Sequence, residues 1–172
     1  DRNLIANMGR VDNAGTFRKV VGTGTTTIDA LFNNSGALQV QTGTLDLTGG
    51  GTHTATSTVS IAAGTTLRLS GGHQFADLGG ITSAGRLLVS ADTVSGDGAL
   101  NLDGLLEIAG GSLVLNSDGA VQGYTQSSGT RDGAGDLTVN GTATLSGGTL
   151  RGRGTTILAN GGELTGIGVD AG

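Results

Sequence analysis

The chain has 172 residues and a formal net charge of -5, with 35 glycines, no proline and no cysteine. Its length fits one domain, its 2% aromatic content excludes an ordinary mixed α/β enzyme core as the default, and its 13% charged residues argue against disorder. Because Lys19 is the only lysine, the chain lacks the clustered cations that phosphate binding needs, and we expect no nucleic-acid partner.

One local unit recurs along the chain: a glycine, a small or polar residue, and then two hydrophobic residues separated by any residue. This alternation is typical of a strand with one buried face. We therefore predict strands of three to five residues, separated by glycine turns. The unit occurs at 36–40, 43–47, 98–102, 104–108, 111–115 and 135–139, with variants at 66–69, 85–89 and 148–150.

A longer period lies above this unit. The segment 13–17 matches 34–38 at a shift of 21 in the numbering, and Gly43, Gly64 and Gly85 repeat that shift twice. A repeat of this length suits one coil of a β-solenoid with two or three short strands, and about eight coils at ~4.8 Å each make a rod about 40 Å long. The spacings beyond residue 98 are less even, so we expect turn insertions in the later coils.

The fold class that these patterns favour is all-β, a single-stranded parallel β-helix. A two-sheet sandwich needs longer strands and more aromatic residues for its thicker core. Helices are expected to be nearly absent, since no segment has a sustained 3.6-residue apolar period. Asn-Gly and Asp-Gly pairs fit solenoid corners, but they also signal hairpins, so an antiparallel all-β fold remains the alternative. The pairs lie at 97–98, 103–104, 118–119, 132–133, 140–141 and 160–161.

Two stretches resemble large exported bacterial proteins. Residues 15–28 look like the glycine-threonine-leucine-x-lysine repeats of autotransporter passengers. Phe32-Asn33-Asn34-Ser35-Gly36, followed by 43–47 and 49–54, is similar to repeats of filamentous-haemagglutinin-like adhesins. The resemblance covers most of residues 7–115. It implies a right-handed parallel β-helix, secretion or outer-surface display, and a role in adhesion, and it supplies no catalytic residue.

Metal binding has two weak candidates. His53 and His73 each follow a glycine pair, and their numbers differ by 20, which places them on neighbouring coils. Zinc would need further ligands, and duplication of a repeat explains the pair more simply. The segment 132–136 approaches a calcium-binding repeat but does not recur at nine-residue steps, so Asp-Gly turns are the better interpretation. We predict no metal site and no cofactor.

Catalysis and ice binding also find little support. Asp92, Asp97 and Asp103 form the densest acidic group, but each lies at a turn or strand end, and no serine-hydrolase elbow is present. Threonine alternates through 52–58, although the shift of 21 maps this run onto residues that are not threonine. Exposed strand threonine accounts for it. We predict that the chain is not an enzyme.

The functional prediction is a structural or adhesive stalk, with residues 1–172 forming one solenoid module of a longer repeat protein. The expected location is extracellular or on the bacterial outer surface. Its partners would be a host or neighbouring cell surface or an extracellular polysaccharide. Neither end looks like a capping helix, so copies could also associate end to end. The alternative is a polysaccharide-binding or polysaccharide-degrading module, which aromatic platforms would favour, but the chain has only Phe17, Phe32, Phe75 and Tyr124.

Overall fold

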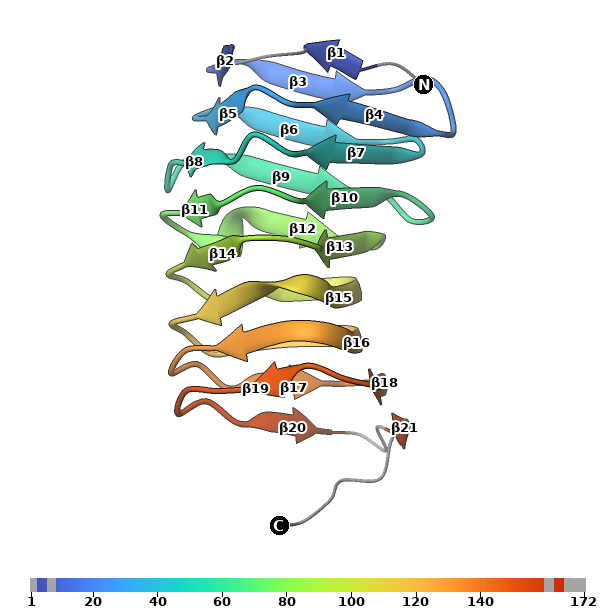
Figure 1. Ribbon diagram of the computed structural model, residues 1–172, viewed down its shortest axis with the longest axis vertical. Coiled ribbons are helices and arrows are strands. Elements are labelled where there is room, and N and C mark those ends of the chain that lie inside the picture. The colour runs from blue at the N-terminus through green and yellow to red at the C-terminus, as the bar shows by residue number, and fades with distance from the viewer. Residues whose placement is uncertain (1–2, 6–8, 160–162, 166–172) are drawn as a thin grey trace.

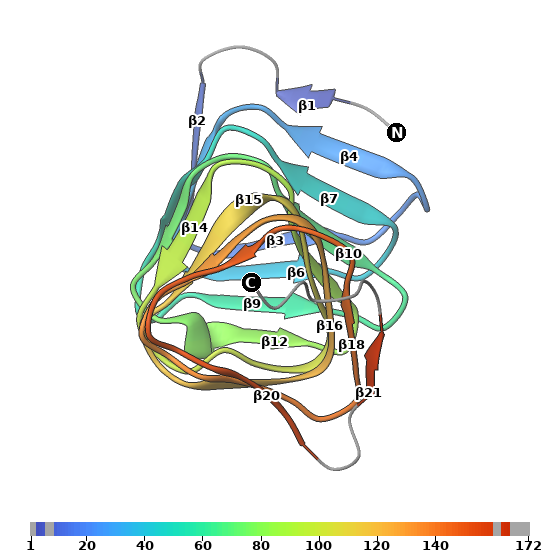
Figure 2. The same ribbon diagram turned by 60° about the horizontal axis from the view of Figure 1, so that its bottom comes forward.

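The computed structural model describes residues 3–5, 9–159 and 163–165, and these wind into a β-solenoid of about eight coils. In Figure 1 the near strands run to the left and the far strands to the right as the chain descends, which is a right-handed winding. Seen toward one end, the coils enclose a three-sided cross-section (Figure 2). The terminal segments predicted to lack capping helices, and the 160–161 corner, extend outside the described residues.

Each side of the cross-section is a stack of short strands, which we call the first, second and third face. The first face contains β1 (Asn3–Ile5), β4 (Thr25–Ile28), β7 (Thr44–Leu47), β10 (Thr66–Leu69), β13 (Arg86–Val89), β18 (Thr142–Leu145) and β21 (Glu163–Thr165). The second contains β2 (Arg10–Asn13), β5 (Leu31–Asn34), β8 (Gly51–His53), β11 (His73–Phe75), β14 (Thr93–Gly96) and β19 (Thr149–Leu150). The third contains β3 (Thr16–Lys19), β6 (Ala37–Val40), β9 (Thr58–Ile61), β12 (Ile81–Ser83), β17 (Leu137–Val139) and β20 (Thr156–Leu158).

Two strands are far longer than the sequence pattern predicted. β15 (Asn101–Leu115) and β16 (Gly119–Asp132) continue around two corners each, and their pairing register slips at those corners. The two strands therefore contribute to all three faces. Strand hydrogen bonding persists through these corners, whereas the earlier coils break it with turns.

Strand direction distinguishes the two predicted all-β folds. Every strand pair within the described part of the chain is parallel, which confirms the β-helix and excludes the antiparallel alternative there. The described helical structure is one 3-10 turn, Leu78–Gly80, as expected from the missing 3.6-residue period. None of the described residues forms a helix that is long and apolar enough to cross a membrane.

The coil length is about 19 residues overall, and it varies along the rod. The shift of 21 is confirmed where Thr16 lies beside Ala37 on the third face. The turn insertions expected in the later coils are absent between β15 and β20, where strands pair at shifts of 18 or 19, as Leu106 does with Tyr124. The last described pair returns to a shift of 21, with Thr142 beside Glu163.

The core is a set of columns in which the same inward position repeats on successive coils. One column on the first face contains Leu45, Leu67, Leu87 and Leu106, all fully buried. The predicted glycine-x-hydrophobic-x-hydrophobic units supply most of these positions. Each buried leucine contributes about 1.5–3 kcal/mol through the area it removes from water. Aliphatic side chains of this size fill the narrow interior, because successive coils bring them within van der Waals contact.

Corner glycines allow successive coils to approach each other. A Cβ added at Gly36 would overlap the carbonyl oxygen of Gly15 on the coil before it. The predicted series of Gly43, Gly64 and Gly85 is only partly in register, since Gly43 and Gly85 directly precede β7 and β13 while Thr65 holds that place before β10. Gly64 lies one position earlier and has φ +74, so it provides a left-handed turn instead.

Candidate functional site

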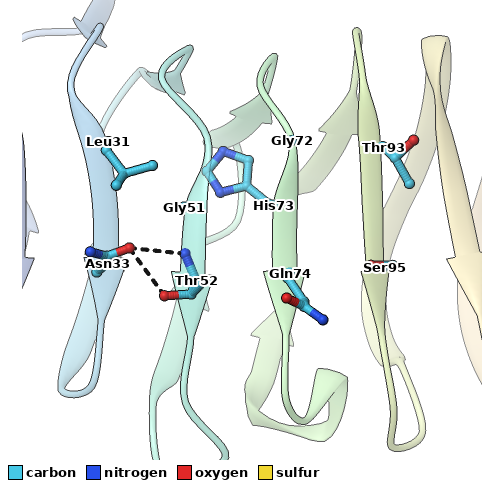
Figure 3. Close-up of a pocket in the computed structure, with 9 residues that line it drawn as sticks. All are labelled: Leu31, Asn33, Gly51, Thr52, Gly72, His73, Gln74, Thr93 and Ser95. Carbon is cyan, nitrogen blue, oxygen red and sulfur yellow. Dashed lines mark hydrogen bonds between the residues drawn. The ribbon is translucent and has the colours of Figure 1, made fainter. Parts of the chain in front are cut away.

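The outward side of the second face has a row of polar side chains. The carboxamide of Asn33 donates a hydrogen bond to Asp12 at 2.9 Å, and its oxygen accepts one from the Thr52 hydroxyl at 3.1 Å and one from the Thr52 backbone N–H at 3.2 Å. Gln74 and Ser95 continue the row on the next two coils, in register with Thr52. Figure 3 shows these side chains side by side on adjacent strands.

A shallow hollow crosses this face over β5, β8, β11 and β14. Leu31, 42% exposed, forms one rim, and Thr93 lies on the other side (Figure 3). The hollow remains open at Gly72, where an added Cβ would meet no atom closer than 3.9 Å. The lining is therefore neutral, with hydroxyl and amide groups beside one exposed leucine. Such a surface offers hydrogen bonds to a hydroxyl-rich ligand but no aromatic ring on which a sugar stacks.

The two histidines lie behind this surface, inside the rod. His53 projects inward from β8 and His73 from β11, and their side chains are buried. The Nε2 atom of His53 is 3.2 Å from Nδ1 of His73. The His53 ring also stacks face to face on Phe75, with centroids 3.9 Å apart and the planes 5° from parallel.

The hydrogen bonds determine which nitrogen carries each proton. His73 Nε2 lies 3.3 Å from the carbonyl oxygen of Leu47, which can only accept, so this nitrogen is the donor. In a neutral His73 the Nδ1 atom is then the acceptor, and His53 Nε2 donates to it. His53 Nδ1 is left as a bare acceptor, and it is buried without a hydrogen-bond partner. Burial lowers the pKa of both imidazoles. The pKa of His53 falls to about 3 through burial first and the neighbouring His73 second.

The histidines meet as predicted, but not through repeat duplication. Duplicated residues would lie at the same register position, whereas His73 pairs with Gly51 and His53 pairs with Phe75. No group of three or more histidine, cysteine or carboxylate side chains that could hold a metal occurs in the parts of the chain that are described. His53 and His73 are arranged as a hydrogen-bonded pair within the core.

The acidic residues considered for catalysis lie far apart around one coil. Asp92 is at the corner before β14, Asp97 at the corner after it, and Asp103 at the following corner within β15. Each marks a different corner of the three-sided cross-section, so the carboxylates do not converge. Asp92 also has a positive φ of 52, a conformation that aspartate tolerates in turns.

The two carboxylates considered for calcium both accept backbone hydrogen bonds. An oxygen of Asp132 accepts the N–H of the following Gly133 at 2.7 Å, which agrees with the Asp-Gly turn interpretation. An oxygen of Asp136 accepts the N–H of Thr155 on the next coil at 2.7 Å.

Threonine forms short columns rather than a flat array. Thr52 lies beside Gln74, so the alternating run through 52–58 does not repeat on the next coil. A column of Thr25, Thr44 and Thr66 is present on the first face, and Arg86 replaces threonine on the coil that follows. A regular threonine face of the kind that orders water is therefore not formed by these strands.

None of the four aromatic side chains forms an exposed platform. Phe32, Phe75 and Tyr124 are buried, and the half-buried Phe17 packs edge-on against Phe32 with ring centroids 5.4 Å apart. All four belong to the core or its margin.

Sequence reasoning missed several polar side chains that point inward. Asn34 is buried beside Asn13 on the second face, Lys19 is buried on β3, and Arg131 is buried on β16. Lys19 donates to Thr26 at 3.0 Å and to two corner carbonyls. Strand alternation was the available signal for Asn34 and Lys19, which lie two positions after Phe32 and Phe17, whereas the glycines two positions to either side of Arg131 gave none.

Fold and site together define a parallel β-solenoid with a polar outer surface and a narrow aliphatic core that contains a histidine pair. Comparison with known proteins does not narrow this class. No family model matches the chain, and neither the curated proteins nor the solved structures contain a significant match.

Proposed function

We propose that this chain is a structural and adhesive stalk segment of a secreted or surface-displayed bacterial protein, and that it acts without catalysis. The observation that supports the proposal is the pairing of a rod-like core with one outward row of hydroxyl and amide groups on the second face, formed by Asn33, Thr52, Gln74 and Ser95. Its members repeat at ~4.8 Å along the axis, so a contact made on one of these coils is available again on the next. Multiple weak contacts of this kind sum to avidity.

The resemblance to autotransporter passengers and filamentous adhesins supports the same proposal. The lack of cysteine is consistent with display outside the cell, where stray thiols cross-link. The proposed partner is a host or neighbouring cell surface. Adhesion then depends on the outward row of the second face, and the core columns make the rod stiff.

Attachment of coated microspheres to cell monolayers under flow tests the adhesive role. Gln74→Lys with Ser95→Lys alters the second face, and Gln39→Lys with Ser60→Lys adds the same charge to the third face as a matched control. We expect attachment by the unaltered chain and a selective loss with the second-face variant. Attachment no greater than that of albumin-coated spheres would overturn the proposal.

A polysaccharide-binding module is the second candidate, favoured by the neutral hollow over β5, β8, β11 and β14. Gly72→Leu places a side chain in this hollow, and its Cβ meets no atom closer than 3.9 Å; Gly15→Leu, at a corner where an added Cβ meets nothing within 4 Å, is the matched control. Binding to a panel of neutral polysaccharides that Gly72→Leu abolishes and Gly15→Leu preserves would support this candidate. No binding across the panel would reject it, and release of new reducing ends would show a degrading activity.

A further inference from the structure

The histidine pair forms the end of a hydrogen-bond chain that two neutral rings complete without a buried charge. The chain runs from His53 Nε2 to His73 Nδ1, and from His73 Nε2 to the Leu47 carbonyl. It joins three strands from neighbouring coils: β8, β11 and β7. The two rings therefore fasten a coil in the upper half of the rod to the one below it (Figure 1).

A single added proton destabilises this arrangement at either ring. A proton on His73 Nδ1 would either place two N–H groups face to face across the 3.2 Å contact with His53 or move the His53 proton to Nδ1, where it has no acceptor. A proton on His53 Nδ1 would create a buried N–H that has no acceptor, because that nitrogen has no partner. Each outcome also puts a positive charge into an aliphatic core, where an unpaired charge is costly.

The surrounding strands provide no carboxylate to balance that charge. From β5, the neighbouring inward residue is the neutral Asn34. Asp46 on β7 faces outward and is held by Arg68 at 3.5 Å and by the Ser70 hydroxyl at 2.6 Å.

Two further carboxylates lie near the strand ends. Asp77, after β11, accepts the Gly79 N–H at 2.8 Å, and Asp97, after β14, accepts from Asn116 at 3.0 Å while facing the surface hollow beside His53. Neither of them hydrogen-bonds to or forms an ion pair with a described imidazole.

We infer that the His53–His73 pair is an acid-sensitive fastener, and that its protonation loosens β8 and β11 while the coils built from β15 and β16 stay closed. In acid, the rod would then bend at β8 and β11, between two parts that stay rigid. This inference does not depend on the proposed adhesive role. It is consistent with the lowered pKa of both rings, because the closed state binds protons less readily than an open one.

The expected effect follows from proton linkage. Below the ordinary histidine pKa of about 6.5, the ratio of open to closed coil rises about tenfold per pH unit if opening takes up one proton, and about a hundredfold if it takes up two. The chain contains two histidines and no cysteine, so in an open coil these rings are the side chains whose ordinary pKa lies between 5 and 7.

Amide hydrogen exchange, expressed as protection factors to remove the intrinsic pH dependence, tests the inference between about pH 7.5 and about pH 5. We expect protection in β8 and β11 to fall by at least about tenfold per pH unit below 6.5 while protection in β15 and β16 holds. Unchanged protection in β8 and β11 would overturn the fastener. An equal fall along the whole rod would also overturn it, because the opening would then be global.

Substitution provides an independent check. His53→Asn extends the inward Asn13–Asn34 pair by one coil and removes one titrating ring. Opening of β8 should then take up one proton fewer, so its protection factor should fall less steeply with decreasing pH. A slope identical to that of the unaltered chain would contradict the assignment. If the variant does not fold, NMR titration of the two imidazoles in the unaltered chain decides, since a ring that titrates near 6.5 in the closed rod would exclude a neutral buried pair.

Discussion

Asn13 donates a hydrogen bond from its side-chain amide to the side-chain oxygen of Asn34, one coil farther on, at a distance of 2.7 Å. The same amide reaches the carbonyl oxygen of Ala37 at 2.8 Å. His53 lies directly beside Asn34 on the next coil, and Phe75 beside His53 on the one after. A column of inward polar and aromatic residues therefore runs along one corner of the core, and it leads into the histidine pair.

Replacing Asn34 with alanine should destabilise the chain by about 1–3 kcal/mol, because the part-buried Asn13 amide loses one acceptor and a void replaces the buried Asn34 side chain. Gln74→Ala is the control, since its exposed side chain on the same face points outward and its loss should cost no more than about 0.5 kcal/mol. Chemical denaturation midpoints of the two variants provide the comparison. Equal losses would show that the inward column does not contribute specifically.

Corner glycines that contact the coil before them should not tolerate a larger residue. Gly36→Ala places a Cβ against the Gly15 carbonyl, and this overpacking should cost about 1–3 kcal/mol or more. Gly15→Ala introduces the same change in the same motif, but nothing lies within 4 Å, so its effect should stay within about 0.5 kcal/mol. Thermal unfolding of both variants measures the difference, and similar melting temperatures would contradict the close approach.

The coil architecture could be predicted because stacking imposes a pattern on the sequence. Each coil needs alternating inward side chains of similar size and a small residue where two corners touch, and both requirements leave a visible repeat. Leu45, Leu67 and Leu87 all belong to predicted strands and share one column. Parallel direction followed from the short strands and narrow core.

The exact register could not be predicted because corners are free to differ in length. The corner at 62–65 is one position longer than its counterpart at 41–43, so β10 and β11 pair at a shift of 22 with the strands above them. The shift of 21 places His73 beside Thr52, whereas it lies beside Gly51. That single step changes the two histidines from separate repeat positions into a bonded pair, which the spacing alone did not reveal.

Tyr124 should resist ionisation in alkaline solution until the rod unfolds. Its hydroxyl donates to Gln126 Oε1 at 2.5 Å, and burial raises its pKa well above the ordinary value of about 10. Above pH 10 the unfolded chain therefore releases a proton that the folded chain retains, so stability falls as pH rises. Since this is the only tyrosine and the chain has no tryptophan, phenolate absorbance reports on it alone. A phenolate signal that appears near pH 10 while far-ultraviolet circular dichroism is unchanged would contradict this prediction.

Arg131 is a buried cation in the later coils, and it follows Val94 and Leu113 in its column. It lies between Leu113 and Leu150, with Nη1 donating to the Gly154 carbonyl at 2.8 Å and Nη2 donating to the carbonyls of Gly135 and Thr155. These acceptors belong to its own corner and to that of the next coil. The side chain therefore ties two successive corners together.

Arg131→Leu should fit the column and yet loosen the coil that contains β20. The leucine matches its neighbours in volume, but the corner carbonyls lose their donors, and leaving the carbonyl of the buried Gly135 unsatisfied should cost about 1–3 kcal/mol. Hydrogen exchange should show the loss in β20 and little change in β10, whereas Arg151→Leu, at an exposed arginine, should leave both unchanged. If Arg131→Leu protects β20 as well as the unaltered chain does, apolar stacking rather than the guanidinium holds this coil in place.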